Sequence, residues 1–310
     1  MSYTVSEISY PSSDLIHTVT GKLYVPAEPP RAILQISHGM VEHIERYEGL
    51  AEALTAQGIL VAGNNHLGHG TTAANADELG FIASSNGVDF ILRDLHSMNL
   101  LLKSRYPDVP VVLMGHSMGS FLARLFVEKY PADVCGVAIV GTGSAPSVLW
   151  LAKALVGITR TLRGERRRPA LLTKLVFGSY NKRCAKDEGA GAWISTDRTV
   201  VEAKDKDPLA NFTFTAAGYG DLFDALGRCN SRAWFDSYPE NLPTFLAAGQ
   251  EDPVGNYGKG VEQVYKNLLL HGCADVRMKL YSGARHEIHN DTCREEFFTD
   301  LTEFVDRITQ

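Results

Sequence analysis

The pentapeptide Gly115-His116-Ser117-Met118-Gly119 fits the pattern G-x-S-x-G, in which a serine occupies a sharp turn between a strand and a helix. An apolar run suited to a buried strand, Val111–Met114, precedes it, and a helical pattern over 121–130 follows. In so tight a turn, side chains two residues to either side of the serine would collide, so both positions must be glycine. The serine then projects above the sheet at a helix N-terminus, whose dipole favours developing negative charge. The pattern therefore predicts that Ser117 is a nucleophile.

A serine hydroxyl is a weak nucleophile at neutral pH, so an acid and then a histidine base must follow Ser117 in the chain. Asp252 follows a predicted strand and directly precedes a proline, which holds its backbone extended and suits a fixed side-chain direction. Glu251 is the rival acid. His286 follows the next predicted strand and a small-residue turn, so we predict that it is the base. His289 is the alternative, but we expect it in or beside the start of the last helix.

Two backbone N–H groups complete the expected site by binding the negative oxygen of a tetrahedral intermediate. Met118, the residue after the nucleophile, supplies the first N–H. An early apolar run, Ala32–Ser37, leads into His38-Gly39-Met40, an H-G segment like that of lipases, so the Met40 N–H is the second. Because these donors belong to the backbone, their side chains matter little.

These residues need a sheet whose strands end side by side. Residues 3–25 alternate polar and apolar positions and break at Pro11-Ser12-Ser13, which predicts an antiparallel hairpin. Short apolar runs then alternate with helical patterns, which predicts an α/β protein with a mostly parallel central sheet flanked by helices. The predicted strands are 32–37, 59–62, 111–114, 134–140, 245–248 and 276–281, and the predicted helices are 45–57, 88–104, 121–130, 258–271 and 294–308.

The alternation stops between residues 143 and 236, where amphipathic segments and glycine breaks replace clear buried strands. This stretch predicts a helical cap inserted after the sixth strand, between two parts of one core, 1–142 and 237–310. An insertion at that point tends to fold over the carboxyl ends of the strands, where open α/β sheets bind ligands.

Composition narrows the classes of partner and compartment. The 310 residues carry a formal net charge of −6, which gives no overall field to hold nucleic acid. Five scattered cysteines without a C-x-x-C pair favour a reducing cytoplasm over a disulfide framework or a zinc site. There is no signal-peptide pattern, and no apolar run reaches the roughly 18 residues that a membrane span needs. We expect a soluble cytoplasmic protein whose lipid contact, through the cap, is peripheral; the oligomeric state is not predicted.

Two further clusters invite other interpretations. His66 and His69 have a spacing that suggests a metal, but no H-E-x-x-H helix or cysteine partner accompanies them, and a serine-type site needs none. We expect structural hydrogen bonds there and neither a metal nor a cofactor. The basic residues of the cap either steer anionic head groups or form a solvated loop. They are Arg163, Arg166, Arg167 and Arg168.

Four segments resemble one branch of the α/β-hydrolases, the monoacylglycerol lipase and lysophospholipase group, which is also related to serine aminopeptidases. They are S-H-G-M-V-E-H-I-E-R-Y at 37–47, L-G-H-G at 67–70, R-Y-P-D-V-P-V-V-L-M-G-H-S-M-G-S at 105–120 and H-E at 286–287. The resemblance covers about 1–142 and 242–310, and the cap only by position. It implies the α/β-hydrolase fold and a triad of Ser117, Asp252 and His286, with Met40 and Met118 donating to the oxyanion.

Two positions depart from the family pattern without touching that triad. Asn65 stands where members usually carry Asp, and Ser120 where many carry Gly. Asn65 can alter the rigidity of a loop near the site.

The sequence thus predicts a serine hydrolase that cleaves carboxylic esters through an acyl-enzyme on Ser117. Monoacylglycerols, lysophospholipids or similar acyl esters are the expected substrates. An aminopeptidase or amidase with the same triad is the alternative, and a non-catalytic ligand-binding protein on the same fold is a third interpretation. The residues available to bind a free amino group would be the carboxylates of the cap, Glu188, Glu202, Asp205 and Asp207.

Overall fold

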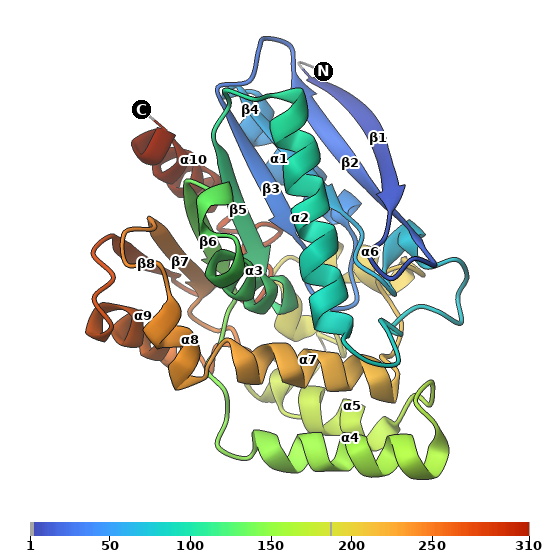
Figure 1. Cartoon of the computed structure of the whole chain (residues 1–310). Coiled ribbons are helices and arrows are strands. Elements are labelled where there is room, and N and C mark those ends of the chain that lie inside the picture. The colour runs from blue at the N-terminus through green and yellow to red at the C-terminus, as the bar shows by residue number, and fades with distance from the viewer. Residues whose placement is uncertain (1–2, 187, 310) are drawn as a thin grey trace.

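The computed structural model describes residues 3–186 and 188–309, which form an eight-stranded sheet in the order β1-β2-β4-β3-β5-β6-β7-β8 (Figure 1). The strands are β1 (Tyr3–Pro11), β2 (Thr18–Pro26), β3 (Ala32–Ser37), β4 (Ile59–Asn64), β5 (Val111–His116), β6 (Gly136–Val140), β7 (Thr244–Gly249) and β8 (Val276–Tyr281). β1 and β2 form an antiparallel hairpin and β2 pairs antiparallel with β4, whereas the other pairings are parallel. The predicted hairpin and mostly parallel sheet are confirmed.

The sheet divides the hydrophobic core into two layers. Strands β3 to β7 are buried along their whole length, as expected for parallel strands covered on both faces. Ile33 packs in the layer that contains α2, α3 and α9, and its neighbour Leu34 packs in the layer that contains α1 and α10. These helices are α1 (Glu48–Thr55), α2 (Gly87–Arg105), α3 (Met118–Lys129), α9 (Lys259–Leu270) and α10 (Arg294–Thr309).

Helices fill the chain between β6 and β7, so the helical insertion after the sixth strand is confirmed. They are α4 (Leu149–Arg163), α5 (Ala170–Phe177), α6 (Arg198–Lys206), α7 (Ala216–Arg228) and α8 (Arg232–Ser237). In Figure 1, α4 and α5 lie at the edge of the molecule, with α7 between them and the sheet. α8 is tied to the core, because the Trp234 indole N–H donates to the Arg124 carbonyl at 2.9 Å. The limits of the cap at residues 143 and 236 stay a prediction.

Short 3-10 helices account for part of the difference between predicted and observed elements. The helix expected over 45–57 is a 3-10 turn, η1 (Ile44–Tyr47), followed by α1. The helix expected over 121–130 begins earlier, at Met118, because the turn at Ser117 leads directly into it. A glycine in that first turn hides its helical character from a propensity argument. The other 3-10 helices are η2 (Gly70–Thr72), η3 (Pro131–Asp133), η4 (Tyr180–Arg183) and η5 (Ala192–Ile194).

Candidate active site

Ser117 occupies a strained turn between β5 and α3. Its backbone has φ 54° and ψ −120°, outside the regions that most residues adopt, and its N–H donates to the Val140 carbonyl at 2.9 Å. A Cβ at Gly115 would overlap the Gly119 carbonyl oxygen, and a Cβ at Gly119 would overlap that of Ser37. The predicted need for two glycines is therefore met by specific contacts. Ser117 is half-buried while its neighbours on both sides are buried, so its side chain faces accessible space.

Asp252 and His286 meet beyond the ends of β7 and β8. The His286 Nδ1 atom lies 2.9 Å from one carboxylate oxygen of Asp252, and the other oxygen accepts from the Val254 N–H at 2.8 Å. Because a carboxylate can only accept, Nδ1 carries the proton and Nε2 is left as the acceptor. A side chain at Gly249 would overlap the Ala284 carbonyl, so this close approach brings the two loops together.

The rival acid, Glu251, points elsewhere. Its carboxylate pairs with the Arg183 guanidinium at 2.9 Å, and both side chains are more than a third exposed. Glu251 therefore has a surface ion pair, whereas Asp252 is fully buried against the imidazole.

The other histidine, His289, is held in a stack. Its ring lies parallel to that of Tyr47, with centroids 4.4 Å apart, and burial lowers its pKa to about 3. His289 lies in the loop that leads to the last helix, α10, which begins at Arg294 as predicted. The loop that carries His289 packs against the core, and the His289 ring is buried.

The serine turn and the His286 imidazole lie on either side of Gly141. A Cβ at Gly141 would be 3.2 Å from the Cε1 atom of His286, and Gly141 directly follows the carbonyl that accepts from Ser117. Among the described residues, the Ser117 hydroxyl makes no hydrogen bond. Its pairing with Nε2 of His286 stays a prediction that this placement favours.

The expected oxyanion donors lie beside the same turn. The loop at Gly39 packs on the nucleophile, since a Cβ at Gly39 would be 3.0 Å from the Ser117 Cβ. Within residues 3–186 and 188–309, neither the Met40 nor the Met118 N–H donates to a protein acceptor. Two unpaired N–H groups beside a nucleophile suit an incoming oxyanion, although their role stays a prediction.

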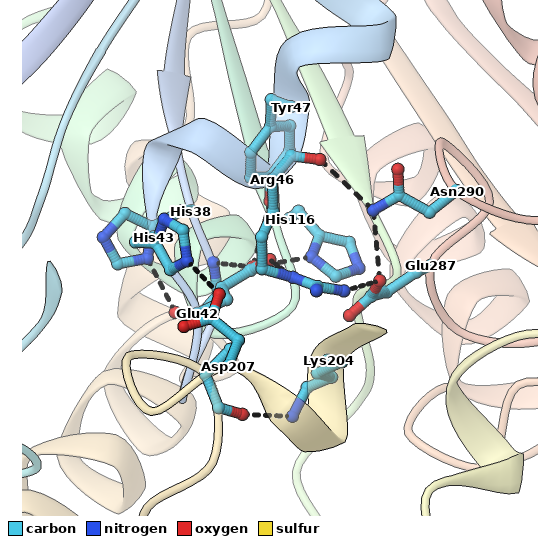
Figure 2. Close-up of polar contacts among 12 residues, drawn as sticks. His38, Glu42, His43, Arg46, Tyr47, His116, Lys204, Asp207, Glu287 and Asn290 are labelled. Carbon is cyan, nitrogen blue, oxygen red and sulfur yellow. Dashed lines mark hydrogen bonds and ion pairs between the residues drawn. The ribbon is translucent and has the colours of Figure 1, made fainter. Parts of the chain in front are cut away.

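Glu42 is the centre of a buried polar network that the sequence did not predict (Figure 2). Its Oε1 atom accepts from the Gly39 N–H, from the Tyr47 hydroxyl at 3.0 Å and from the His116 Nδ1 atom at 3.1 Å. Burial by itself raises the pKa of Glu42, but the charge of His116 and the hydrogen bond from it hold that pKa well below its ordinary value. Glu42 thus fixes the loop that carries Gly39 and Met40.

His116 links this network to His286. Its Nε2 atom lies 3.3 Å from the His286 carbonyl oxygen, while Nδ1 faces Glu42. Both partners are acceptors, which favours the protonated form of His116, since only that form donates from both nitrogens. Burial lowers its pKa, but the Glu42 charge and hydrogen bond more than compensate and raise it.

A second buried ion pair lies beside the first. The Arg46 guanidinium contacts the Glu287 carboxylate at 2.5 Å, and the Asn290 amide donates to Glu287 at 3.1 Å (Figure 2). Burial raises the pKa of Glu287, but the Arg46 charge lowers it overall. The sequence offered one signal for Glu42, Arg46 and Glu287: they are charged residues in short segments that also hold Gly39 or His286.

One group of possible metal-ligating side chains lies beside the site among the described residues. Glu42, His116 and His289 place possible ligand atoms within 4.8 Å of one another. The Oε1 atom of Glu42 accepts from three protein donors, one of them His116, whereas among the described residues the Glu42 Oε2 atom and both ring nitrogens of His289 have no hydrogen-bond partner. His66 pairs with Ser37 at 3.1 Å, and burial holds the pKa of the His69 ring at about 3, so that ring is neutral.

Asn65 supports the loop that precedes α1. Its side-chain oxygen accepts from the Ile44 N–H at 3.0 Å, and its amide donates to the hydroxyls of Thr20 and Thr71. An amide can donate and accept at once, so Asn65 bridges β2 and this loop in a way that a carboxylate cannot.

The cap reaches the core through two ion pairs near the site. His43 lies between Glu45 and Asp207, with 2.7 Å to each carboxylate, and Arg285 contacts Glu188 at 2.6 Å.

The basic residues of the cap, predicted either to steer head groups or to form a solvated loop, are partly structural. Arg168 donates to the Thr213 carbonyl, and the Arg166 guanidinium lies 3.8 Å from the Phe81 ring centroid.

The chain matches known proteins over most of its length. The model of the serine aminopeptidase (S33) family matches residues 28–293. The chain is 28% identical to a monoglyceride lipase homolog of monkeypox virus over 277 residues, covering 87% of each chain, and 27% identical to human monoglyceride lipase over 292 residues, covering 91% and 86%. A thermostable carboxyl esterase from Bacillus coagulans, solved with glycerol, superposes with a TM-score of 0.92 at 28% identity over 99% of both chains. Across the described ranges, the helices are all too short or too polar to span a bilayer.

Proposed function

The chain belongs to the serine aminopeptidase (S33) family, and on that basis we propose that Ser117, His286 and Asp252 are its catalytic triad. It is a carboxylic ester hydrolase with the α/β-hydrolase fold. The observation that carries the residue assignment is the buried 2.9 Å contact between Asp252 and His286 beside a strained, half-buried serine.

The proposed reaction is a two-step acyl transfer. The Nε2 atom of His286 takes the proton from Ser117 as its oxygen attacks the ester carbonyl carbon. The N–H groups of Met40 and Met118 bind the resulting oxyanion. When the carbon–oxygen bond breaks, His286 gives that proton to the departing alkoxide. Water then attacks the acyl-enzyme by the same steps, which releases the acid and restores Ser117.

Acylglycerol-like esters are the proposed substrates, with peripheral lipid contact through the cap. The outer side of α4 carries Leu151, Ile158 and Leu162 at helical spacing, and α5 adds Leu171 and Leu175, each 49–76% exposed. We define these five residues as the outer apolar face. Exposed apolar residues gathered on two neighbouring helices are typical of a surface that meets lipid or another protein.

The aminopeptidase alternative lacks a free carboxylate in three of its four candidate positions. Glu188 pairs with Arg285 at 2.6 Å, Asp207 pairs with His43 at 2.7 Å, and Glu202 pairs at the surface with Lys206. An ester substrate needs none of them. We therefore favour esters over aminoacyl amides.

We also propose that the protein works in a reducing compartment such as the cytoplasm. All five cysteines are free thiols, and Cys229 and Cys273 are buried, where oxidation would disturb packing.

The test is turnover of p-nitrophenyl esters from C2 to C18 and of monoacylglycerols, compared with aminoacyl-anilides. Ester turnover by the wild type and its loss by about 10⁴-fold in Ser117→Ala are expected, because triad members act as a unit. Near-normal turnover in Ser117→Ala would reject the nucleophile, and faster anilide cleavage would reverse the choice of substrate.

A further inference from the structure

One segment of the cap, Ala192–Thr196, is fastened to the loop that carries His286. The Trp193 carbonyl accepts from the His286 N–H at 3.4 Å, and the Ile194 carbonyl accepts from the Glu287 N–H at 2.8 Å. The Arg285 guanidinium donates to the carbonyls at both ends of η5, Ala192 at 2.8 Å and Ser195 at 3.2 Å. This loop therefore donates hydrogen bonds to the carbonyls of four successive cap residues, Ala192 to Ser195.

This docking places an indole against the base. The ring centroids of Trp193 and His286 are 5.1 Å apart with an interplanar angle of 37°. The Trp193 ring also contacts those of Tyr180 and Phe177, with centroids 4.9 Å and 5.8 Å away, and its backbone N–H donates to the Asn181 amide oxygen at 2.9 Å. These contacts hold the indole in place beside the imidazole.

An aromatic face attracts a cation within about 6 Å of its centroid. His286 becomes a cation during the reaction, when it holds the proton of Ser117. We propose that Trp193 is a positioning residue for His286, which orients the ring and stabilises the imidazolium as it forms. This inference rests on the proposed function, because it assigns His286 as the base.

The charged groups around His286 are few. Asp252 contacts Nδ1, the His116 imidazolium lies with its ring centroid 4.7 Å away, and the neighbouring Arg285 is paired with Glu188. Trp193 is an uncharged residue that packs against the His286 ring. Its removal leaves those charges in place, so a change in the pH profile reports the loss of the indole.

The kinetic test compares Trp193→Leu and Trp193→Phe on p-nitrophenyl acetate and p-nitrophenyl octanoate. A cation–π contact of ordinary strength predicts that Trp193→Leu lowers kcat/KM by about 3- to 30-fold, equally for both esters, and moves the acidic limb of the profile to lower pH by about half a unit or more. Trp193→Phe, which keeps an aromatic ring at this position, should retain most of the wild-type kcat/KM and most of the wild-type pH profile. Trp150→Leu, which removes an exposed indole of α4, is the matched control, and its kcat/KM and pH profile should equal those of the wild type.

Fluorescence gives a second measurement that does not depend on turnover. Imidazolium quenches a neighbouring indole more than neutral imidazole does, so wild-type emission should fall in one step as the pH is lowered. That step should vanish in Trp193→Phe and in His286→Gln. A step that persists in Trp193→Phe, unchanged kcat/KM in Trp193→Leu, or a loss confined to the KM of the octanoate would each overturn the inference. A wild type without ester turnover would instead reject the proposed function.

Discussion

The turn at Ser117 and the helices α4 and α5 are the two regions that we propose to meet a substrate, and they are packed in opposite ways. Around the turn, a Cβ at Gly119 would overlap the backbone of β3, and the residues next to Ser117 are buried. On α4, only Ala152, Val156 and Thr159 are buried, and a Cβ at Gly157 would meet nothing within 4 Å. The difference teaches that the turn has a single permitted geometry, whereas the outer apolar face tolerates change and is free to serve contact.

The largest expected effect that tests this comparison comes from replacing the proposed base, His286. His286→Ala should lose ester turnover by about 10⁴-fold, because the triad acts as a unit. His289→Ala should keep most turnover and instead lose about 1–3 kcal/mol of unfolding free energy, because it empties a buried stack on Tyr47. Steady-state kinetics and urea unfolding measure the two effects. The reverse pattern would mean that the wrong histidine was chosen.

Two glycine substitutions test the difference in packing between the Ser117 turn and α4. Gly119→Ala should cost about 3 kcal/mol or more of unfolding free energy, or prevent folding, since its methyl group would overlap the Ser37 carbonyl. Gly157→Ala should stabilise the protein by about 0.5–1 kcal/mol, because alanine favours the helix and nothing obstructs it. Thermal and urea unfolding give both values. Equal effects at the two glycines would contradict the contrast in packing.

A smaller, pH-dependent effect tests how the cap is held to the core. Burial lowers the pKa of His43, but its hydrogen bonds to Glu45 and Asp207 raise that pKa overall. A group with a raised pKa in the folded state stabilises the protein below its unfolded pKa, and this contribution disappears as the pH rises through the folded value. Asp207→Asn should therefore cost about 1 kcal/mol near pH 6 and little near pH 9. A cost that grows with pH would refute this assignment.

Much of the fold and the triad follows from local signals. The sheet follows from short apolar runs, Ser117 from the glycines on either side, and Asp252 and His286 from their places after two strands. Each of these depends on residues close together in the chain, where propensity and steric rules apply.

The rest depends on contacts between distant segments. Glu42 meets His116 across 74 residues, and Trp193 meets His286 across the second half of the cap and three further elements. No periodicity marks Glu42 or Trp193, because their positions are fixed by which loops pack together. The stack of His289 on Tyr47 was not predicted for the same reason, since it joins the two ends of the core.

Peptide mapping after reaction with a fluorophosphonate probe tests the central claim most directly. One covalent adduct on the Ser117 hydroxyl is predicted in the wild type, with labelling slowed severely in His286→Ala. An adduct on any other residue, or undiminished labelling without His286, would contradict the account.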